Sequence, residues 1–377
     1  MASIATAGQT GLHVAIAGAG LLGRLLAWRL SRAGHQVTVV DPAPGPQPPP
    51  VGSIAAVQHA AAFTAAGMLS PLAELDSTGP ALATLGWRSL PLWRATCEAL
   101  GRSELFRQHG SLLLAHPGDR GSAQRLLARL HEAPAGTPRP EALDATQLAA
   151  LEPALAPGLV GWHLPGEGQV MPRELMAALH DDTANVSWRW RERVTSVTAR
   201  TLSLSDGETL RCDWAIDTRG VAGQVGALQP RGVRGELAWL HAPGLPLTRP
   251  LRLLHPRHRV YLVPRPGEVI VVGASEIESE DRSPPSLRSL VELLAAAHSV
   301  LPELAEARLL HLEANLRPAL PDHHPRCHAE PGLLQLNGLF RHGWLLAPAL
   351  VDDALAACGL VPKETPHADT HVPQLAH

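Results

Sequence analysis

The stretch HVAIAGAGLLGRLLAWRLSRAGHQVTVVD, residues 13–41, decides the fold of this 377-residue chain. An apolar run at 12–17 leads into GAGLLG at 18–23, and a second apolar run, QVTVV, fills 36–40. Between the two runs a helical pattern begins at Leu21 and ends at Gly34. Its apolar side carries Leu22, Leu25, Leu26 and Leu30, and its polar side carries Arg24, Arg29 and Arg32. Strand, helix and strand within about 30 residues predict a βαβ unit.

The three glycines of GAGLLG have the spacing of a dinucleotide-binding turn. Gly18 allows a tight turn, Gly20 lets the backbone approach a pyrophosphate, and Gly23 lets helix and strand pack closely. The pyrophosphate would meet the free amides and the positive dipole end of the helix. Asp41 ends the second strand, where an acid accepts a hydrogen bond from a ribose hydroxyl. A glycine-rich turn with another purpose is the alternative, but the flanking strands, helix and terminal acid favour dinucleotide binding. An acid at position 41 favours an unphosphorylated ribose, and thus NAD or FAD over NADP.

The rest of the chain separates NAD from FAD, because an NAD dehydrogenase usually continues into further βαβ units. Here the proline-rich segment PAPGPQPPP (42–50) is followed by a mostly helical region at 81–133 with an apolar run at 111–115. Further expected elements are a loop at 134–140, a short helix at 144–151, hairpins at 186–216, two strands within 259–273, and helices at 286–301 and 347–358. Such an interrupted order suits a flavoprotein whose FAD domain is assembled from separate segments.

Composition excludes several classes of enzyme. The chain has one lysine, Lys363, which lies in a proline- and histidine-rich tail. Schiff-base enzymes need a desolvated lysine and P-loop enzymes need one after their glycine-rich loop, so both are excluded. A net charge of −3 without a basic run gives no sign of nucleic-acid binding. We expect a cytoplasmic protein with no signal peptide and no membrane span.

Cysteine and histidine give no sign of a metal site. The four cysteines, Cys97, Cys212, Cys327 and Cys358, lie far apart and are expected to be reduced thiols. Histidine pairs such as His323-His324 are common by chance among twenty histidines, and no HExxH spacing occurs. We therefore expect no metal ion.

Several ordered motifs make the chain similar to the D-amino-acid oxidase family of flavoproteins. They are residues 13–41, TAAGMLSPLAE (64–74), VRGE (233–236), YLVPRPGEVIVVGAS (261–275), LRP (316–318) and GLFRHGWLLAP (338–348). The likeness extends from Gly11 to Gly359 and is greatest to the glycine-oxidising members that serve thiamine synthesis. It implies an α/β fold: a Rossmann-like, discontinuous FAD-binding domain plus an α+β substrate domain with an antiparallel sheet. We expect the FAD domain at 11–80, 145–230 and 310–361, the substrate domain at 81–144 and 231–309, and disordered tails at 1–10 and 362–377.

The resemblance also implies site residues. A substrate carboxylate would be held by Tyr261, Arg317 and Arg341, with Met68 and Glu74 near the substrate. Non-covalent FAD would lie against Gly18, Gly20, Leu21, Leu22, Gly23, Asp41, Pro42, Ala66, Gly67, Met68, Val194, Leu339, Phe340, Arg341, His342, Gly343, Trp344 and Leu345. For each arginine the alternative is a solvated surface charge, for Met68 ordinary core packing, and for Glu74 the cap of a turn.

The chain departs from the family pattern at five positions. Asp41 stands where glutamate is usual, Ala61 and Ala62 replace hydroxyl residues, and His342 replaces an asparagine. Glu276 occupies a position near the substrate that is expected to be apolar.

The implied reaction is oxidation of glycine or a small amino acid or amine to the oxo acid (glyoxylate), ammonia and hydrogen peroxide. The flavin carries the chemistry, so no catalytic base is expected, and the protein contributes position and electrostatics. Molecular oxygen is the expected acceptor, and a homo-oligomer is possible. Two alternatives stay open: a D-amino-acid or secondary-amine (sarcosine-like) enzyme with another substrate or acceptor, and a flavin-binding protein without turnover.

Overall fold

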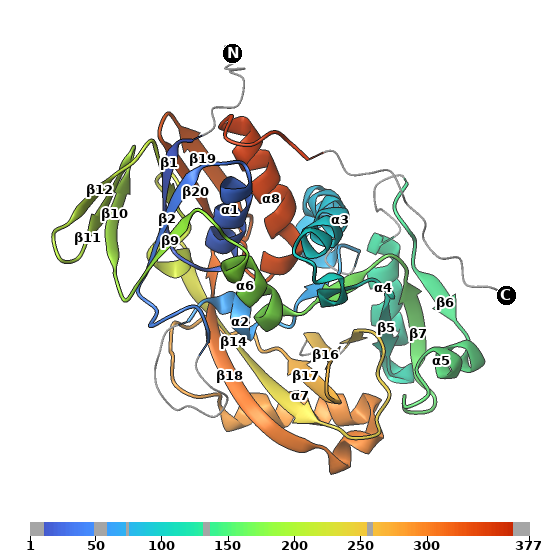
Figure 1. Cartoon of the computed structure of the whole chain (residues 1–377). Helices are drawn as coiled ribbons and strands as arrows, with labels where there is room; N and C mark the ends of the chain where they lie inside the picture. Colours follow the sequence, from blue (N-terminus) through green and yellow to red (C-terminus); the bar gives the residue numbers. More distant parts are fainter. Residues whose placement is uncertain (1–10, 49–58, 73–74, 131–135, 255–258, 365–377) are drawn as a thin grey trace.

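The computed structural model describes residues 11–48, 59–72, 75–130, 136–254 and 259–364 (Figure 1). A six-stranded sheet forms one layer, in the order β19-β20-β13-β1-β2-β9. The strands are β1 (His13–Ala17), β2 (Gln36–Asp41), β9 (Val186–Trp190), β13 (Trp214–Asp217), β19 (Arg326–Glu330) and β20 (Leu333–Asn337). All neighbours pair in parallel except β19 with β20. The expected βαβ unit, β1-α1-β2, is therefore the centre of a Rossmann-type sheet.

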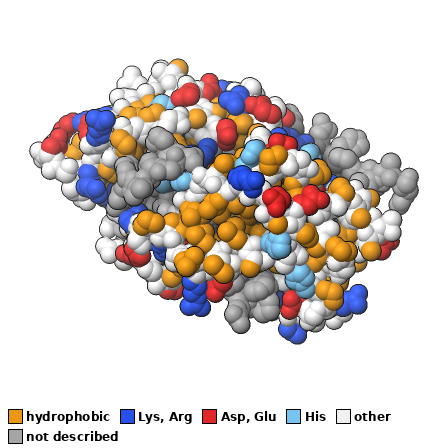
Figure 2. Space-filling view, turned by 90° about the horizontal axis from the view of Figure 1, so that it is seen from below, with side chains coloured by type: hydrophobic (Ala, Val, Ile, Leu, Met, Phe, Trp, Pro, Cys, Tyr) orange, Lys and Arg blue, Asp and Glu red, His pale blue; other side chains and the backbone are white. Residues whose placement is uncertain are grey.

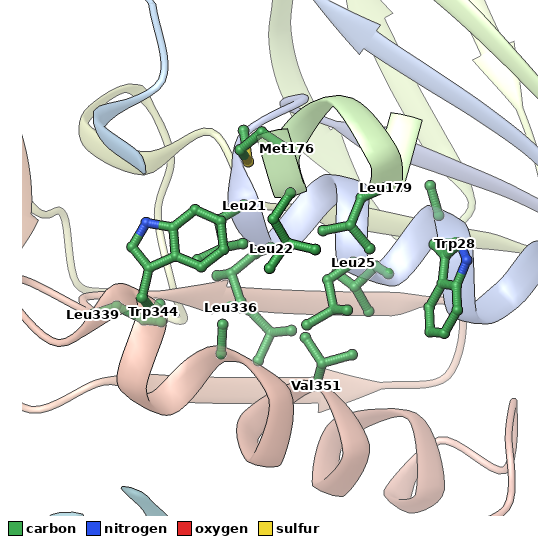
Figure 3. Close-up of a cluster of buried hydrophobic side chains, with 14 of the residues drawn as sticks. Leu21, Leu22, Leu25, Trp28, Met176, Leu179, Leu336, Leu339, Trp344 and Val351 are labelled. Atoms are coloured by element: carbon green, nitrogen blue, oxygen red, sulfur yellow. The ribbon is translucent and has the colours of Figure 1, made fainter. Parts of the chain in front are cut away.

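Three helices cover one face of this sheet and form its core with it. They are α1 (Leu21–Arg32), α6 (Pro172–Asp181) and α8 (Gly343–Ala357). Figure 3 shows apolar side chains from α1, α6 and α8 meeting Leu336 of β20. A fourth helix, α3 (Leu75–Ala99), packs against α8.

Helix α1 is more buried than its sequence pattern predicts. Arg24 and Arg29, expected on a polar face, are 1% and 8% exposed, and Arg32 alone of the three arginines is exposed. The Arg24 guanidinium donates to the carbonyls of Ala19, Met176 and Pro46, and Arg29 pairs with Asp352 at 3.3 Å. The expectation was wrong because α6 and α8 cover α1 on two sides, which local periodicity cannot report. Burial lowers the pKa of Arg24 to about 10.

A second, eight-stranded sheet has the order β18-β14-β17-β16-β15-β5-β7-β6. Its strands are β5 (Ser111–Ala115), β6 (Glu141–Leu143), β7 (Val160–Leu164), β14 (Arg231–His241), β15 (Leu251–Leu254), β16 (Arg259–Arg265), β17 (Val269–Gly273) and β18 (Arg308–Ala319). Only β15 and β5 pair in parallel, so the expected antiparallel sheet is present. Helix α7 (Leu287–Val300) packs on it and leaves Leu287 and Val291 exposed. Figure 2 views the molecule from below Figure 1 and shows apolar side chains gathered in the middle of this lower face.

Two small sheets and several short elements complete the fold. One sheet contains β3 (Met68–Leu69), β8 (Gly168–Val170) and β4 (Phe106–Arg107); the other contains β10 (Val194–Thr198), β11 (Thr201–Leu204) and β12 (Thr209–Arg211). The remaining helices are α2 (Ala61–Thr64), α4 (Arg120–Leu130) and α5 (Ala145–Leu151), with 3-10 turns at Ser103–Leu105, Pro117–Asp119, Gly220–Ala222 and Pro302–Glu306. The hairpins expected at 186–216 are therefore confined to β10–β12, because β9 and β13 join the parallel sheet.

Helix α8 begins four residues before its expected start at Ala347, and it continues through Pro348. Proline has no backbone N–H, so the carbonyl of Trp344 lacks its helical partner. The indole N–H of Trp93 on α3 donates to that carbonyl at 2.6 Å. The proline therefore leaves no helix carbonyl unsatisfied. The helix can for this reason begin at Gly343 and Trp344, ahead of Pro348.

The expected division into domains stays a prediction, and three elements bear on its boundaries. Strand β7 lies in the eight-stranded sheet although it falls in the expected FAD range 145–230. Strand β18 lies in the same sheet although most of it falls in 310–361. Helix α3 packs with α8 of the FAD-domain range although most of it falls in the expected substrate range 81–144. The expected tails fall almost entirely outside the described residues.

Candidate active site

A cavity of about 570 Å³ lies between the two sheets. Its walls come from the β1–α1 turn, the end of β2, residues 59–70 and the 218–222 turn on one side. On the other side they come from β14, β16, β18 and residues 274–276, and the segment 336–345, which leads from β20 into α8, also lines the cavity. Segments far apart in the sequence thus meet around a single space.

The end of the cavity beside α1 presents backbone donors and one acid. Gly20 caps α1 with no side-chain hydrogen bond, so the first amides of this 12-residue helix keep their donor capacity. The Asp41 carboxylate accepts from the backbone N–H of Ala19 at 2.7 Å and of Ala43 at 2.8 Å, which fixes it beside the turn. A helix N-terminus with an adjacent carboxylate fits a pyrophosphate and a ribose hydroxyl.

Close packing explains why the first and third glycines of GAGLLG are needed. A Cβ on Gly18, whose φ is +100°, would lie 2.8 Å from the carbonyl oxygen of Thr218. A Cβ on Gly23 would lie 1.8 Å from the carbonyl oxygen of Gly18. Gly23 therefore lets helix and turn pack, as expected, and it does not line the cavity. The cradle fits a dinucleotide such as FAD.

Two segments far apart in the sequence line the middle of the cavity. Ala66, Gly67 and Met68 precede and begin β3, while the turn from Leu339 to His342 leads into α8. His342 is the N-cap residue of α8 and its side chain makes no capping hydrogen bond to the helix, and Gly343 and Trp344 in the first turn line the cavity. The positive dipole end of α8 therefore faces the cavity, where it favours negative charge.

The far end carries a phenol and two guanidinium groups, those of Tyr261, Arg317 and Arg341. Glycines of neighbouring strands make room for two of them. A Cβ on Gly235 of β14 would lie 2.2 Å from the Arg317 guanidinium, and a Cβ on Gly273 of β17 would lie 2.5 Å from the Tyr261 hydroxyl. Gly235 of the VRGE motif thus lets Arg317 lie across the neighbouring strand. Gly273 of the YLVPRPGEVIVVGAS motif does the same for Tyr261.

Burial shapes the electrostatics of this end. It raises the pKa of Tyr261 above its ordinary value of 10.0, although Arg317 and Arg341 nearby partly offset the shift. The phenol therefore stays protonated and can donate. Burial also lowers the pKa of Arg317, which remains a cation at neutral pH because its ordinary pKa of 12.5 is far above 7 and the nearby Glu276 carboxylate partly offsets the shift. Arg317 Nη1 donates to the Ser275 carbonyl at 3.1 Å, which orients the guanidinium.

Arg341 carries an anionic partner on the cavity wall. Its Nη1 lies 3.2 Å from the Glu276 carboxylate. The Arg341 side chain is 17% exposed and that of Glu276 is 48% exposed. A substrate carboxylate that binds Arg341 would therefore meet this acid.

Nearly all residues expected at the site line this cavity. They are Gly18, Gly20, Leu21, Leu22, Asp41, Pro42, Ala66, Gly67, Met68, Val194, Tyr261, Arg317, Leu339, Phe340, Arg341, His342, Gly343, Trp344 and Leu345. Gly23 packs beneath the turn instead, and Glu74 lies outside the described residues. Ala61 and Ala62 also line the cavity.

Other lining residues escaped the sequence analysis. Ser70 is 2% exposed, and its hydroxyl has no hydrogen-bond partner among the described residues. Arg252 and Arg282 add two cations to the wall. Arg234 lies behind it and donates to the carbonyls of Asp281, Ser283 and Pro284. Ser70 lies in the TAAGMLSPLAE motif and Arg234 in the VRGE motif, but neither was expected at the site, and Arg252 and Arg282 lie in none of the motifs.

The described part of the chain holds no group of three metal-ligating side chains. Its four cysteines are free thiols. None of the helices within those ranges is long and apolar enough to span a membrane.

Comparison with known proteins agrees with this geometry. The family described as FAD dependent oxidoreductase (DAO) matches residues 13–354. The Rhizobium etli protein named as a thiamine biosynthesis oxidoreductase, ThiO, is 36% identical over 344 residues, which are 91% of this chain and 95% of that protein.

Two further relatives link the sequence to solved structures. A glycine oxidase of Geobacillus kaustophilus is 26% identical over 356 residues, 89% of each chain. The crystal structure of glycine oxidase from that organism aligns with a TM-score of 0.76 at 24% identity, covering 93% of this chain and 95% of that one. The iminodiacetate oxidase of Chelativorans sp. BNC1 has a TM-score of 0.75 at 26% identity and covers 94% and 97%. With the glycine cradle and the matched family, the chain belongs to the FAD dependent oxidoreductases of the DAO family, and its cofactor is FAD.

Proposed function

We propose that the protein oxidises glycine, or a similarly small amino acid or amine, to the oxo acid, ammonia and hydrogen peroxide. The observation that carries the proposal is the cluster of Tyr261, Arg317 and Arg341 at one end of a cavity whose other end is a dinucleotide cradle. Such a cluster binds a carboxylate, and the cavity holds the carboxylate and the cofactor in one space.

Each residue of the cluster has a separate task in substrate binding. The planar guanidinium of Arg317 can bind a carboxylate with two parallel hydrogen bonds, which sets direction as well as affinity. Tyr261 donates a third hydrogen bond from a protonated phenol. Arg341 contributes positive charge beside them. A carboxylate held in this way leaves the adjacent Cα with little freedom to rotate, which is the main catalytic contribution of positioning.

FAD would be held by the β1–α1 turn and by residues 66–68 and 339–345, and it would supply the hydride acceptor for oxidation at the substrate Cα. The chain supports that step by electrostatics, because the N-terminus of α8 directs its positive dipole end into the cavity. Apolar lining groups such as Met68 and Leu345 limit the access of water. We assign no catalytic base. A substrate amine that binds in its neutral form has already lost its proton in solution, so no side chain has to remove one before hydride transfer.

The relatives support a small amine as substrate. The Rhizobium etli protein is named for thiamine biosynthesis and the Geobacillus kaustophilus protein for glycine oxidation. We therefore also propose that the product feeds synthesis of the thiamine thiazole, that oxygen is the electron acceptor and that the enzyme acts in the cytoplasm.

A second candidate is the oxidation of secondary amines. The similarity to an iminodiacetate oxidase favours it, because iminodiacetate is a secondary amine. A dehydrogenase with an acceptor other than oxygen is a variant of either candidate.

An anaerobic amine panel tests the proposal. Purified protein with bound FAD is mixed with glycine, sarcosine, D-alanine or L-alanine, and the loss of flavin absorbance is followed. We expect glycine to bleach the flavin and Arg317→Leu to lose this reaction while retaining FAD. If no amine bleaches the flavin, the protein binds a flavin without turning over an amine, and the proposal is wrong. Comparing peroxide release in air with dye reduction under argon identifies the acceptor.

A further inference from the structure

The strongest unexplained feature of the cavity is an acid among its cations. Among the described residues that line it, Asp41 and Glu276 are the acids. Asp41 lies at the end beside α1, whereas Glu276 lies 3.2 Å from Arg341 at the opposite end. Six of the described arginines line the cavity. Arg193 and Arg219 adjoin Val194 and Thr218 in the chain, and the other four are Arg252, Arg282, Arg317 and Arg341. Glu276 therefore offsets part of a local excess of positive charge.

The backbone on both sides of Glu276 is fixed to the eight-stranded sheet. The N–H of Ser275 donates to the Glu236 carbonyl at 3.2 Å. Arg234 and Ile277 exchange two backbone hydrogen bonds, of 2.9 and 3.0 Å, as an isolated bridge. Glu276 thus lies between two anchored residues and is held at the wall rather than on a free loop.

A buried ion pair reinforces this anchor. Arg234 donates to the Glu236 carboxylate at 2.8 Å and, through its other nitrogens, to carbonyls of the segment that follows Glu276. The Glu236 carboxylate also accepts from the backbone N–H of Ser286 at 3.2 Å. The segment 277–286 is therefore tied to β14 at several points, which fixes the backbone of Glu276 within reach of Arg341.

We propose that Glu276 is a specificity-determining residue that restricts the site to amines carrying one carboxylate. The inference rests on the proposed function and specifies its substrate class. A monocarboxylate can use Arg317 and Tyr261, while Glu276 supplies the negative charge that Arg341 attracts. A second carboxylate on the substrate would have to compete with Glu276 for Arg341 and would be repelled by the same acid. Without this residue, four arginines would favour a dianion.

The proposal predicts a change in preference when the charge is removed. In Glu276→Gln, the ratio of kcat/KM for iminodiacetate to kcat/KM for glycine should rise about tenfold. That factor corresponds to about 1.4 kcal/mol, the scale of one partly exposed charge interaction. The change should lie in KM and not in kcat, because Glu276 acts on binding. Glu276→Asp keeps the charge and should keep the wild-type preference.

Glu278→Gln is the matched control. Glu278 lies two residues further along, pairs with Arg231 at 2.9 Å and does not line the cavity. Removing its charge should leave the ratio unchanged. An equal rise in this variant would show a general effect of net charge and overturn the assignment, as would an unchanged ratio in Glu276→Gln.

Binding of unreactive carboxylates separates this inference from the proposed function. Acetate and malonate are titrated into the FAD-bound protein, and the perturbation of the flavin spectrum gives their Kd values. We expect malonate to gain about tenfold over acetate in Glu276→Gln and nothing in Glu278→Gln. This result holds even if no amine reduces the flavin, which would count against the proposed function alone. Equal changes for both carboxylates would contradict a role for Glu276 in selecting charge.

Discussion

At the scale of single residues, the site depends on side chains that lie across glycines. Arg317 lies over Gly235, and Tyr261 lies over Gly273, each at a separation that a Cβ would not allow. Both glycines are in extended strands and neither has a positive φ, so their role here is close approach. The substrate cluster is therefore specified as much by the strands beneath it as by its own three residues.

A methyl group at Gly235 should displace the Arg317 guanidinium. In Gly235→Ala we expect the KM for glycine to rise at least tenfold while FAD content stays at the wild-type level, because the cradle is at the other end of the cavity. Steady-state kinetics and the flavin-to-protein absorbance ratio measure the two effects. Gly118→Ala is the control, since nothing lies within 4 Å of a Cβ at that glycine. Unchanged kinetics in Gly235→Ala would contradict this account of Arg317.

Tyr261 should act as a neutral donor over a wide pH range. Its folded-state pKa is raised above 10.0, so the phenol keeps its proton up to at least that pH. The Kd of acetate should thus show no loss of affinity from phenol ionisation below pH 10. Tyr261→Phe should weaken acetate about tenfold at pH 8, the worth of a hydrogen bond to a charged group. A wild-type loss of affinity with a midpoint below pH 10, absent from the variant, would refute the assignment.

Residue roles could be inferred from the sequence only where a motif marks them. The spacing of GAGLLG indicated residues that line the cavity, because it reflects local geometry, and the resemblance to the family implied those of the LRP and FRHGWLLAP segments. Ser70 lies in the TAAGMLSPLAE motif but was not singled out, and Arg252 and Arg282 lie outside every motif, since their position depends on how β15 and the 274–286 segment meet the rest of the cavity. The counter-charge role of Glu276 likewise depends on a contact across 65 residues.

At the scale of elements, α8 connects the core to the cavity. Its first turn lines the cavity and its later residues pack on α1 and α3. The sequence predicted that the helix ends at residue 358, and α8 ends at Ala357, shortly before Gly359, whose φ of +67° fits the residue that follows a helix. It did not predict the start, because the donor that compensates for Pro348 comes from Trp93, which lies 251 residues away from Trp344.

Removing that donor should destabilise the protein. Trp93→Phe leaves the buried Trp344 carbonyl without its partner, at a cost of about 1–3 kcal/mol of unfolding free energy. Trp87→Phe on the same helix is the control, because the Trp87 indole N–H is buried without a partner among the described residues. Thermal and urea unfolding of the FAD-bound proteins should give a lower Tm and midpoint for Trp93→Phe than for Trp87→Phe. Equal losses would show that only the size of the ring matters.

At the scale of the whole molecule, the site exists because two sheets of different kinds face each other. The parallel sheet supplies the β1–α1 turn and Asp41, and the antiparallel sheet supplies Tyr261, Arg317 and the wall around Glu276. The resemblance implied both sheets. The expected domain ranges, however, put the residues of β7 and most of β18 in the FAD domain and most of α3 in the substrate domain, because consecutive residues were assigned together. Long-range pairing decides these elements, and a single sequence does not show it.

The central claim is that this cavity binds a small amino acid beside FAD and oxidises it. The most direct measurement mixes the FAD-bound protein anaerobically with glycine, records the flavin spectrum, and then admits air and assays the products. The account predicts bleaching by glycine in the wild-type protein, recovery of the spectrum in air with one peroxide per glyoxylate, and no bleaching in Arg317→Leu. A flavin that stays oxidised with glycine and every other small amine, in protein that retains FAD, would contradict it.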